Sequence, residues 1–133
     1  MVYILEKDGQ PLMLSIGKNM NTLKLHPEYI KAIEYTKKTL YSSEIGNDIK
    51  YIILYGSSAR EDIKFHSDID ILVVFDDLFF KKRENVHIYR KIRNSFFDVE
   101  DIPEIDIKAV SLSSWLYDKT IYLDMVRKEG IAL

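Results

Sequence analysis

The stretch from Tyr51 to Asp76, YIILYGSSAREDIKFHSDIDILVVFD, limits the fold of this chain more than any other part. One apolar run ends at Gly56 and Ser57, ten residues follow, and Asp68 and Asp70 then open a second apolar run. Short continuous apolar runs bounded by turn residues are typical of strands that are covered on both faces. The stretch therefore predicts a buried strand, a tight turn, a short helical segment, a loop and a second buried strand.

The polar residues of this stretch indicate a metal and phosphate site. Asp68 and Asp70 are two residues apart, and side chains at that spacing leave the same face of a strand. Their carboxylates are expected to share divalent cations, because Mg²⁺ binds hard oxygens and completes its shell with phosphate and water. Gly56 lets the backbone approach a phosphate, Ser57 offers a hydroxyl, and the helical N-terminus that follows directs N–H groups at an anion. The alternative is an acidic strand start after a surface loop.

The motif Gly-Ser, ten residues, Asp-x-Asp resembles the signature of the polymerase-beta-like nucleotidyltransferases. The longer strings YGSSAR, residues 55–60, and SDID, residues 67–70, resemble the minimal nucleotidyltransferase (MNT) branch of that superfamily. The resemblance covers roughly residues 27 to 133. It departs at Glu61, where the family usually has glycine, and at Ser58, where it often has a larger polar or basic residue.

The resemblance implies roles for five residues. Asp68 and Asp70 would hold two Mg²⁺ ions, or Mn²⁺, on a nucleoside triphosphate that is expected to be ATP, and Gly56 and Ser57 would cradle its terminal phosphates. Asp106, the second residue of another predicted strand, would complete the catalytic metal site and help to deprotonate the incoming hydroxyl. The assignment of Asp106 rests on the resemblance alone, and the alternative is an acid on an edge strand that faces solvent.

Arg60 has two interpretations. It lies in the short helical segment after the turn, where its guanidinium suits a contact with phosphate. It suits equally well an ion pair with Glu61, Asp62 or one of the motif aspartates. Both interpretations stay open.

The predicted fold class is α/β (α+β), with a small mixed sheet, helices mainly on one face, and an N-terminal β-hairpin. Helical spacing of apolar residues predicts a helix from Pro27 to about Ser43 and a second helix that starts with the basic run at residues 81–83. Alternation predicts a strand over Ile105–Val110. A last helix is predicted to begin at Ser113 or Ser114, as its N-cap, and to end at Gly130.

Residues 2–16 predict the hairpin, because Asp8 and Gly9 form a strong turn signal between two apolar runs. This part lies outside the family resemblance. We therefore expect a hairpin extension over residues 1–26 and a nucleotidyltransferase domain over residues 27–133. The hairpin is either an added strand pair or an edge that binds a partner.

Composition excludes several classes of protein. A chain of 133 residues has room for one catalytic domain. The formal net charge of −2 gives no overall attraction to nucleic acid or to anionic lipid, so no direct nucleic-acid binding is expected. The chain has no cysteine, which excludes disulfides and thiolate metal sites. Its apolar runs are too short to span a membrane and no secretory signal is visible, so a cytoplasmic location is expected.

Three functions follow from the resemblance. The first is transfer of NMP, expected to be AMP, from an NTP to a hydroxyl of a partner protein, because the chain lacks the extra helical domain with which larger relatives form an acceptor pocket. MNT proteins typically pair with a HEPN-domain protein, as antitoxin to its toxin, so a HEPN partner and a homo- or hetero-oligomer are expected. The second is a binding module that neutralises its partner by occupancy, which Glu61 favours. The third is a small-molecule (antibiotic) nucleotidyltransferase. Tyr117, Tyr122 and the hairpin are candidate docking surfaces.

Overall fold

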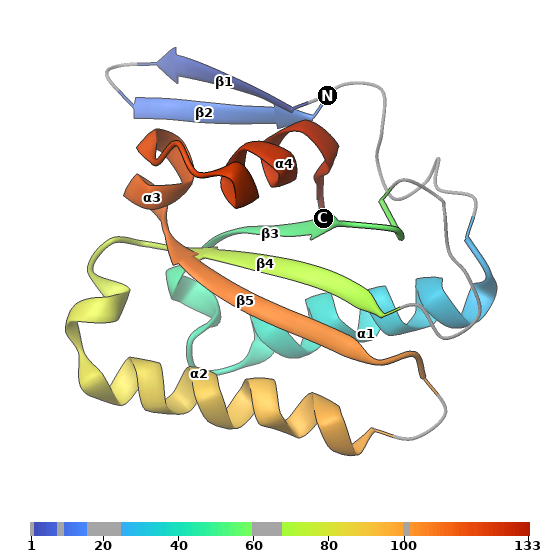
Figure 1. Ribbon diagram of the computed structural model, residues 1–133. Coiled ribbons are helices and arrows are strands. Elements are labelled where there is room, and N and C mark those ends of the chain that lie inside the picture. Colours follow the sequence, from blue (N-terminus) through green and yellow to red (C-terminus); the bar gives the residue numbers. More distant parts are fainter. Residues whose placement is uncertain (1, 8–9, 16–24, 60–67, 100–101) are drawn as a thin grey trace.

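The computed structural model describes residues 2–7, 10–15, 25–59, 68–99 and 102–133 (Figure 1). The strands are β1 (Val2–Lys7), β2 (Gln10–Ser15), β3 (Ile49–Tyr55), β4 (Ile69–Phe75), β5 (Ile105–Ser111) and β6 (Ile131–Ala132). The α-helices are α1 (Pro27–Ser42), α2 (Arg83–Ser95), α3 (Leu112–Tyr117) and α4 (Ile121–Glu129). Single 3₁₀ turns lie at Gly46–Asp48, Phe79–Lys81 and Phe96–Asp98.

The central sheet has the strand order β5-β4-β3-β6. β4 runs parallel to β5, while β3 is antiparallel to both β4 and β6, so the predicted mixed sheet is confirmed. β1 and β2 form a separate antiparallel hairpin, paired from Val2 with Ser15 to Lys7 with Gln10. The hairpin lies against α4 (Figure 1). Its predicted Asp8–Gly9 turn lies outside the described residues.

Side chains of the inner strands β3 and β4 alternate between the two faces of the sheet, so each face contributes to a separate apolar core. Ile52 and Leu54 of β3 belong to the core that α1 and α2 cover, whereas Ile53 and Tyr55 belong to the core that α3 and α4 cover. Both inner strands are buried almost throughout. The two long helices therefore share one face of the sheet and the two short helices lie on the other, which accounts for the continuous apolar runs (Figure 1).

The C-terminal part differs from the single helix predicted. α3 ends at Tyr117, and Thr120 caps a new helix by accepting a hydrogen bond from the Leu123 N–H at 3.1 Å. Arg127 stabilises the break, because its guanidinium donates to the backbone carbonyls of Ser114, Trp115 and Asp118 at the end of α3. The Ser114 carbonyl also accepts a hydrogen bond from the backbone N–H of Asp118 at 3.0 Å, and carbonyls at a helix end commonly need partners from outside the helix.

The predicted N-cap was also wrong. Ser111 caps α3, and its hydroxyl accepts a hydrogen bond from the Ser114 N–H at 3.2 Å, so Ser113 and Ser114 lie inside the helix. The strand β5 thus passes directly into α3 without a loop. Gly130 does end α4, and its N–H donates to the Val126 carbonyl at 2.7 Å.

A search of the described helices finds none that is both long enough and apolar enough to cross a membrane.

Candidate active site

The register of the sheet brings Asp70 and Asp106 together. Asp70 of β4 lies directly opposite Asp106 of the parallel strand β5, and Tyr55 of β3 lies opposite Asp70 on the other side. Residues directly opposite each other project from the same face of a sheet. That face is the one that α3 and α4 partly cover, because Tyr55 belongs to their apolar core. Two carboxylates thus lie side by side near the starts of β4 and β5.

Gly56 ends β3 in a conformation that few other residues adopt. Its φ of 74° lies in the left-handed region, where a Cβ is unfavourable. A Cβ built on Gly56 would lie 2.5 Å from Asp70 Oδ2 and 3.3 Å from its Cγ. Both the backbone conformation and the lack of space for a Cβ therefore favour glycine here. The same short distances show that the Asp70 carboxylate lies against the turn that follows β3.

Asp68 occupies a different position. It is exposed and lies one residue before β4, whose first residue, Ile69, donates a backbone hydrogen bond of 2.8 Å to the Glu104 carbonyl. Burial, followed by the negative charges of Asp68 and Glu28, raises the pKa of the Tyr29 hydroxyl on α1. The field of Asp68 thus reaches α1, on the opposite side of the sheet from the core that contains Tyr55.

Within the described part of the chain, no group of three or more His, Asp or Glu side chains is arranged to hold a metal ion. The structure therefore brings together Asp70 and Asp106 but does not add Asp68 to them in such a group. The metal-binding roles of Asp68, Asp70 and Asp106 stay predictions.

Lys108 is a residue of this site that the sequence analysis missed. Its Nζ donates a hydrogen bond of 2.9 Å to Asp106 Oδ2, and the two side chains are 52% and 49% exposed. The hydrogen bond to Asp106 is the largest of the effects that raise the pKa of the Lys108 ammonium, so the lysine is charged. The spacing of two residues in Ile105-Asp106-Ile107-Lys108 was the available signal, because it places both side chains on one face of a strand.

Two tyrosines complete the network around Lys108. The Tyr122 hydroxyl donates to the Tyr55 hydroxyl at 2.8 Å, and the rings meet edge to face with centroids 5.7 Å apart. The ammonium of Lys108 lies 5.9 Å from the centroid of the Tyr122 ring. Burial is the main cause that raises the pKa of both hydroxyls, so they remain protonated at neutral pH. Tyr122, expected on a docking surface, is half-buried beside this network, whereas Tyr117 is 62% exposed.

Comparison with known families assigns the chain. The family described as "Polymerase beta, Nucleotidyltransferase" matches residues 34–123, which is more than half of the chain. This protein belongs to the polymerase beta nucleotidyltransferase family.

Solved structures give two similar chains, each at 20% sequence identity. One is from the crystal structure of a toxin-antitoxin with AMP-PNP, with a TM-score of 0.44; the match covers 71% of this chain and 66% of that chain. The other is described as a nucleotidyltransferase from Sulfolobus solfataricus, with a TM-score of 0.45; the match covers 89% of this chain and 90% of that chain. No curated protein gives a significant match.

Only part of the nucleotidyltransferase signature lies within the described residues. Gly56 and Ser57 lie in the turn after β3, and Ser57 is half-buried. Ser58 is fully buried, and its hydroxyl has no hydrogen-bond partner among the described residues. Arg60 and Glu61 lie outside the described residues, so the phosphate contact of Arg60 stays a prediction.

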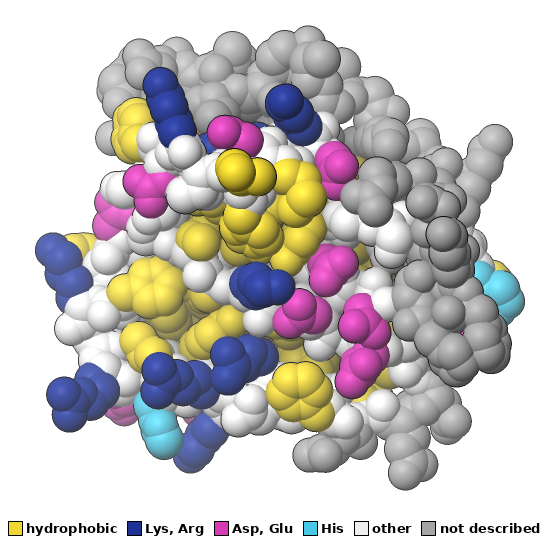
Figure 2. Space-filling view, viewed as in Figure 1, with side chains coloured by type: hydrophobic (Ala, Val, Ile, Leu, Met, Phe, Trp, Pro, Cys, Tyr) yellow, Lys and Arg dark blue, Asp and Glu magenta, His cyan; other side chains and the backbone are white. Residues whose placement is uncertain are grey.

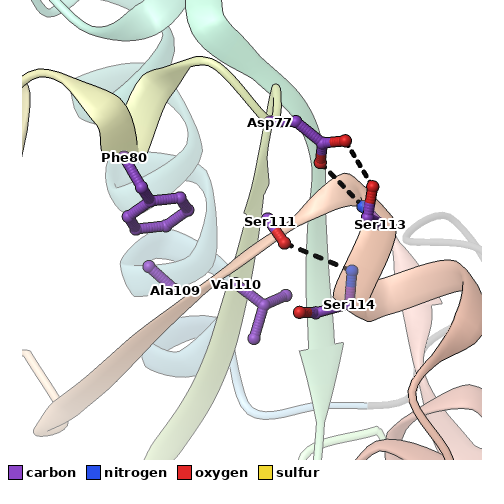
Figure 3. A pocket seen from close by; sticks show the side chains of 7 residues that line it. All are labelled: Asp77, Phe80, Ala109, Val110, Ser111, Ser113 and Ser114. Atoms are coloured by element: carbon purple, nitrogen blue, oxygen red, sulfur yellow. Dashed lines mark hydrogen bonds between the residues drawn. The ribbon is translucent and has the colours of Figure 1, made fainter.

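A pocket of about 480 Å³ lies at the other end of β5 (Figure 3). Its lining residues are Asp77, Phe80, Ala109, Val110, Ser111, Ser113 and Ser114. Asp77 accepts hydrogen bonds from both the backbone N–H and the hydroxyl of Ser113, and Ser111 caps α3. The acid of this pocket therefore caps the start of α3, and none of the predicted site residues that the structure describes lines the pocket.

Figure 2 shows two local groups of like charge among the mixed charges of this face. Acidic side chains gather over the starts of β4 and β5, with a basic side chain beside them, whereas basic side chains gather along α2.

Proposed function

We propose that the protein is a Mg²⁺-dependent nucleotidyltransferase that moves NMP, expected to be AMP from ATP, to a hydroxyl of a partner protein. The observation that carries this proposal is the contact between Gly56 and Asp70. Left-handed backbone at Gly56 and the space that its missing Cβ leaves hold the Asp70 carboxylate against the turn of the Gly-Ser motif. Family membership supplies the reaction type.

Asp70 and Asp106 are the paired carboxylates that would hold the metal, with Asp68 as the third candidate. Their hard oxygens suit Mg²⁺, and the close Gly56–Asp70 approach keeps one of them beside the motif turn. When bound, Mg²⁺ would offset the charge of the triphosphate. In the transfer, the acceptor oxygen forms a bond to the α-phosphorus as the bond to pyrophosphate breaks, and the hydroxyl proton passes to Asp106.

The acceptor is expected to come from outside the chain. β5 is an edge strand of the central sheet and Asp106 is about half exposed, so a second molecule can reach the carboxylates. Ile121, the neighbour of Tyr122 in the sequence, is 92% exposed, and Tyr117 is also exposed. These two exposed apolar side chains flank the break between α3 and α4 and are candidates for contact with a docked protein. We infer a HEPN-domain protein as the partner and a tyrosine hydroxyl as the acceptor.

A second candidate function has one observation in its favour. Lys108 is paired with Asp106, and the described residues contain no group of three acids arranged for a metal. Such a site fits a module that neutralises its partner by occupancy, without transfer.

Intact mass spectrometry separates the two candidates. The protein is incubated with Mg²⁺, each NTP in turn and the co-purifying partner, and Asp70→Asn serves as the inactive control. We expect the partner to gain the mass of one NMP with wild type only. A stable complex in which the partner gains no mass with any NTP would rule out the transferase function and leave the binding-module function. If the protein binds no partner but transfers NMP to an aminoglycoside, the small-molecule nucleotidyltransferase function would replace both candidates.

A further inference from the structure

The Lys108–Asp106 ion pair lies at the position where the proposed metal would bind. Lys108 Nζ contacts Asp106 Oδ2 at 2.9 Å, and Asp106 faces Asp70 across the β4–β5 pair. Both negative charges act on Lys108, Asp106 more strongly than Asp70. An ammonium thus already compensates part of the charge that two adjacent carboxylates create.

Neighbouring residues hold this ammonium in place. Lys108 lies two residues after Asp106 on β5, so the strand geometry directs both side chains to the same face. The ring of Tyr122 lies beside the ammonium, and the hydroxyl bond to the buried core residue Tyr55 fixes that ring. A second lysine, Lys50, meets Asp76 at the longer distance of 3.7 Å, and among the described residues no aromatic ring lies beside its ammonium. Lys108 is therefore part of the site and not a passing surface contact.

We propose that Lys108 is an internal competitor for the divalent cation, which occupies Asp106 and weakens metal binding by the free protein. This inference rests on the proposed function, because it takes Asp70 and Asp106 as metal ligands. A divalent cation placed on Asp106 would meet the ammonium at close range, and like charges at short distance repel. The metal therefore has to displace Lys108 from the carboxylate, and Lys108 is a positioning residue that sets the metal affinity of the acidic pair.

Mn²⁺ binding without nucleotide tests this inference independently of catalysis. Free Mn²⁺ is followed by electron paramagnetic resonance in titrations of the wild type, Lys108→Met, Lys108→Arg and Lys50→Met. The pair is half exposed and worth about 1 kcal/mol, so Lys108→Met should bind Mn²⁺ about fivefold more tightly. Lys108→Arg keeps the charge and should bind as the wild type does. Lys50→Met makes the same change of net charge beside Asp76 and should also bind as the wild type does.

The outcomes separate the inference from the proposed function. Equal Mn²⁺ affinity for the wild type and Lys108→Met, with binding lost in Asp106→Asn, would overturn the role of Lys108 and leave the metal site standing. Absence of Mn²⁺ binding in every variant would overturn the metal site and the inference with it. An equal gain in Lys50→Met would show a general charge effect and would also overturn the inference. Circular dichroism melting confirms that each variant is folded.

Discussion

The two ends of the β4–β5 pair both carry carboxylates and use them differently. At the end where both strands start, Asp70 and Asp106 face each other across the pair, with Lys108 on one of them. At the end where β4 finishes, Asp76 accepts a hydrogen bond from the Leu78 N–H at 2.9 Å, and Asp77 is bound by Ser113. The hydrogen bonds from Ser113 lower the pKa of the Asp77 carboxyl.

The two ends differ in what their acids contact. Asp76 and Asp77 satisfy backbone N–H groups that a turn and a helix start leave free, so their negative charges stabilise local structure. Asp70 and Asp106 place like charges directly opposite each other, which costs stability in a sheet. This opposed pair lies between Gly56, where a Cβ would meet Asp70, and Lys108, which donates to Asp106.

Among the substitutions that test this difference between the two ends of the β4–β5 pair, Asp70→Asn should have the largest effect. Mutation of a residue that only hydrogen-bonds to a metal ligand typically lowers metal affinity or activity about 10–100-fold. Loss of Asp70, which is itself the proposed ligand, should therefore lower NMP transfer by at least about 100-fold. The variant should stay folded, because asparagine has nearly the same shape and volume as aspartate. Transfer is measured by intact mass and stability by thermal melting, with Asp76→Asn as the control at the other end. If Asp70→Asn and Asp76→Asn lost transfer activity equally, the proposed difference between the two ends of the β4–β5 pair would be wrong.

Gly56→Ala should have the next largest effect. The new Cβ would meet Asp70 Oδ2 and would sit at positive φ, which costs about 1–2 kcal/mol of stability. Transfer should fall as well, because the Asp70 carboxylate has to move. Gly130→Ala is the matched control: its Cβ would lie 2.5 Å from the Val126 carbonyl oxygen and 2.6 Å from a side-chain carbon of Ile53, away from the acids. It should lose stability but keep its activity per folded molecule, and loss of transfer there would count against the role of Gly56.

Most of the framework of this site could be predicted from the sequence. The continuous apolar runs before Gly56 and after Asp68 correspond to β3 and β4, because both inner strands are covered on two faces. The phosphate contact expected of Gly56 stays a prediction, and the structure shows instead that the Asp70 carboxylate lies close to this glycine. These features depend on local pattern, which the chain displays directly.

The remaining features depend on pairings between distant residues. Nothing local to Asp106 shows that β5 lies beside β4 in a register that places it opposite Asp70; only the family resemblance suggested it. The contact of Lys108 with Tyr122 joins β5 to α4 across a break between helices. That break was missed because Arg127, nine residues beyond Asp118, supplies the donors that end α3. Capping by a distant side chain leaves no signature at the helix end itself.

Asp77→Ala should have a smaller effect, confined to stability. It removes the acceptor for the Ser113 N–H and hydroxyl at the start of α3, and loss of a capping acceptor costs about 0.5–1 kcal/mol in exposed cases. NMP transfer should be unchanged, because Asp77 lies at the far end of β4 from Asp70. Denaturant unfolding of the wild type, Asp77→Ala, Ser113→Ala and the double variant gives the coupling between the two residues. Additive effects in that cycle would show that the Asp77–Ser113 contact carries no stability.

The pH dependence of the same contact should give the smallest effect. Hydrogen bonds from Ser113 hold the pKa of Asp77 below its usual value in the folded protein, so the folded state favours the ionised carboxylate. This contribution to stability is complete above the unfolded pKa of about 3.9 and is lost as the pH falls through the lower folded pKa. The difference in melting temperature between the wild type and Asp77→Ala should therefore be constant from pH 7 to about pH 5 and should shrink below about pH 4. Asp77 is exposed and screened by solvent, which keeps the difference small. A difference that stays constant or widens at low pH would mean that Asp77 acts on α3 as a neutral hydrogen-bond acceptor and not through its charge.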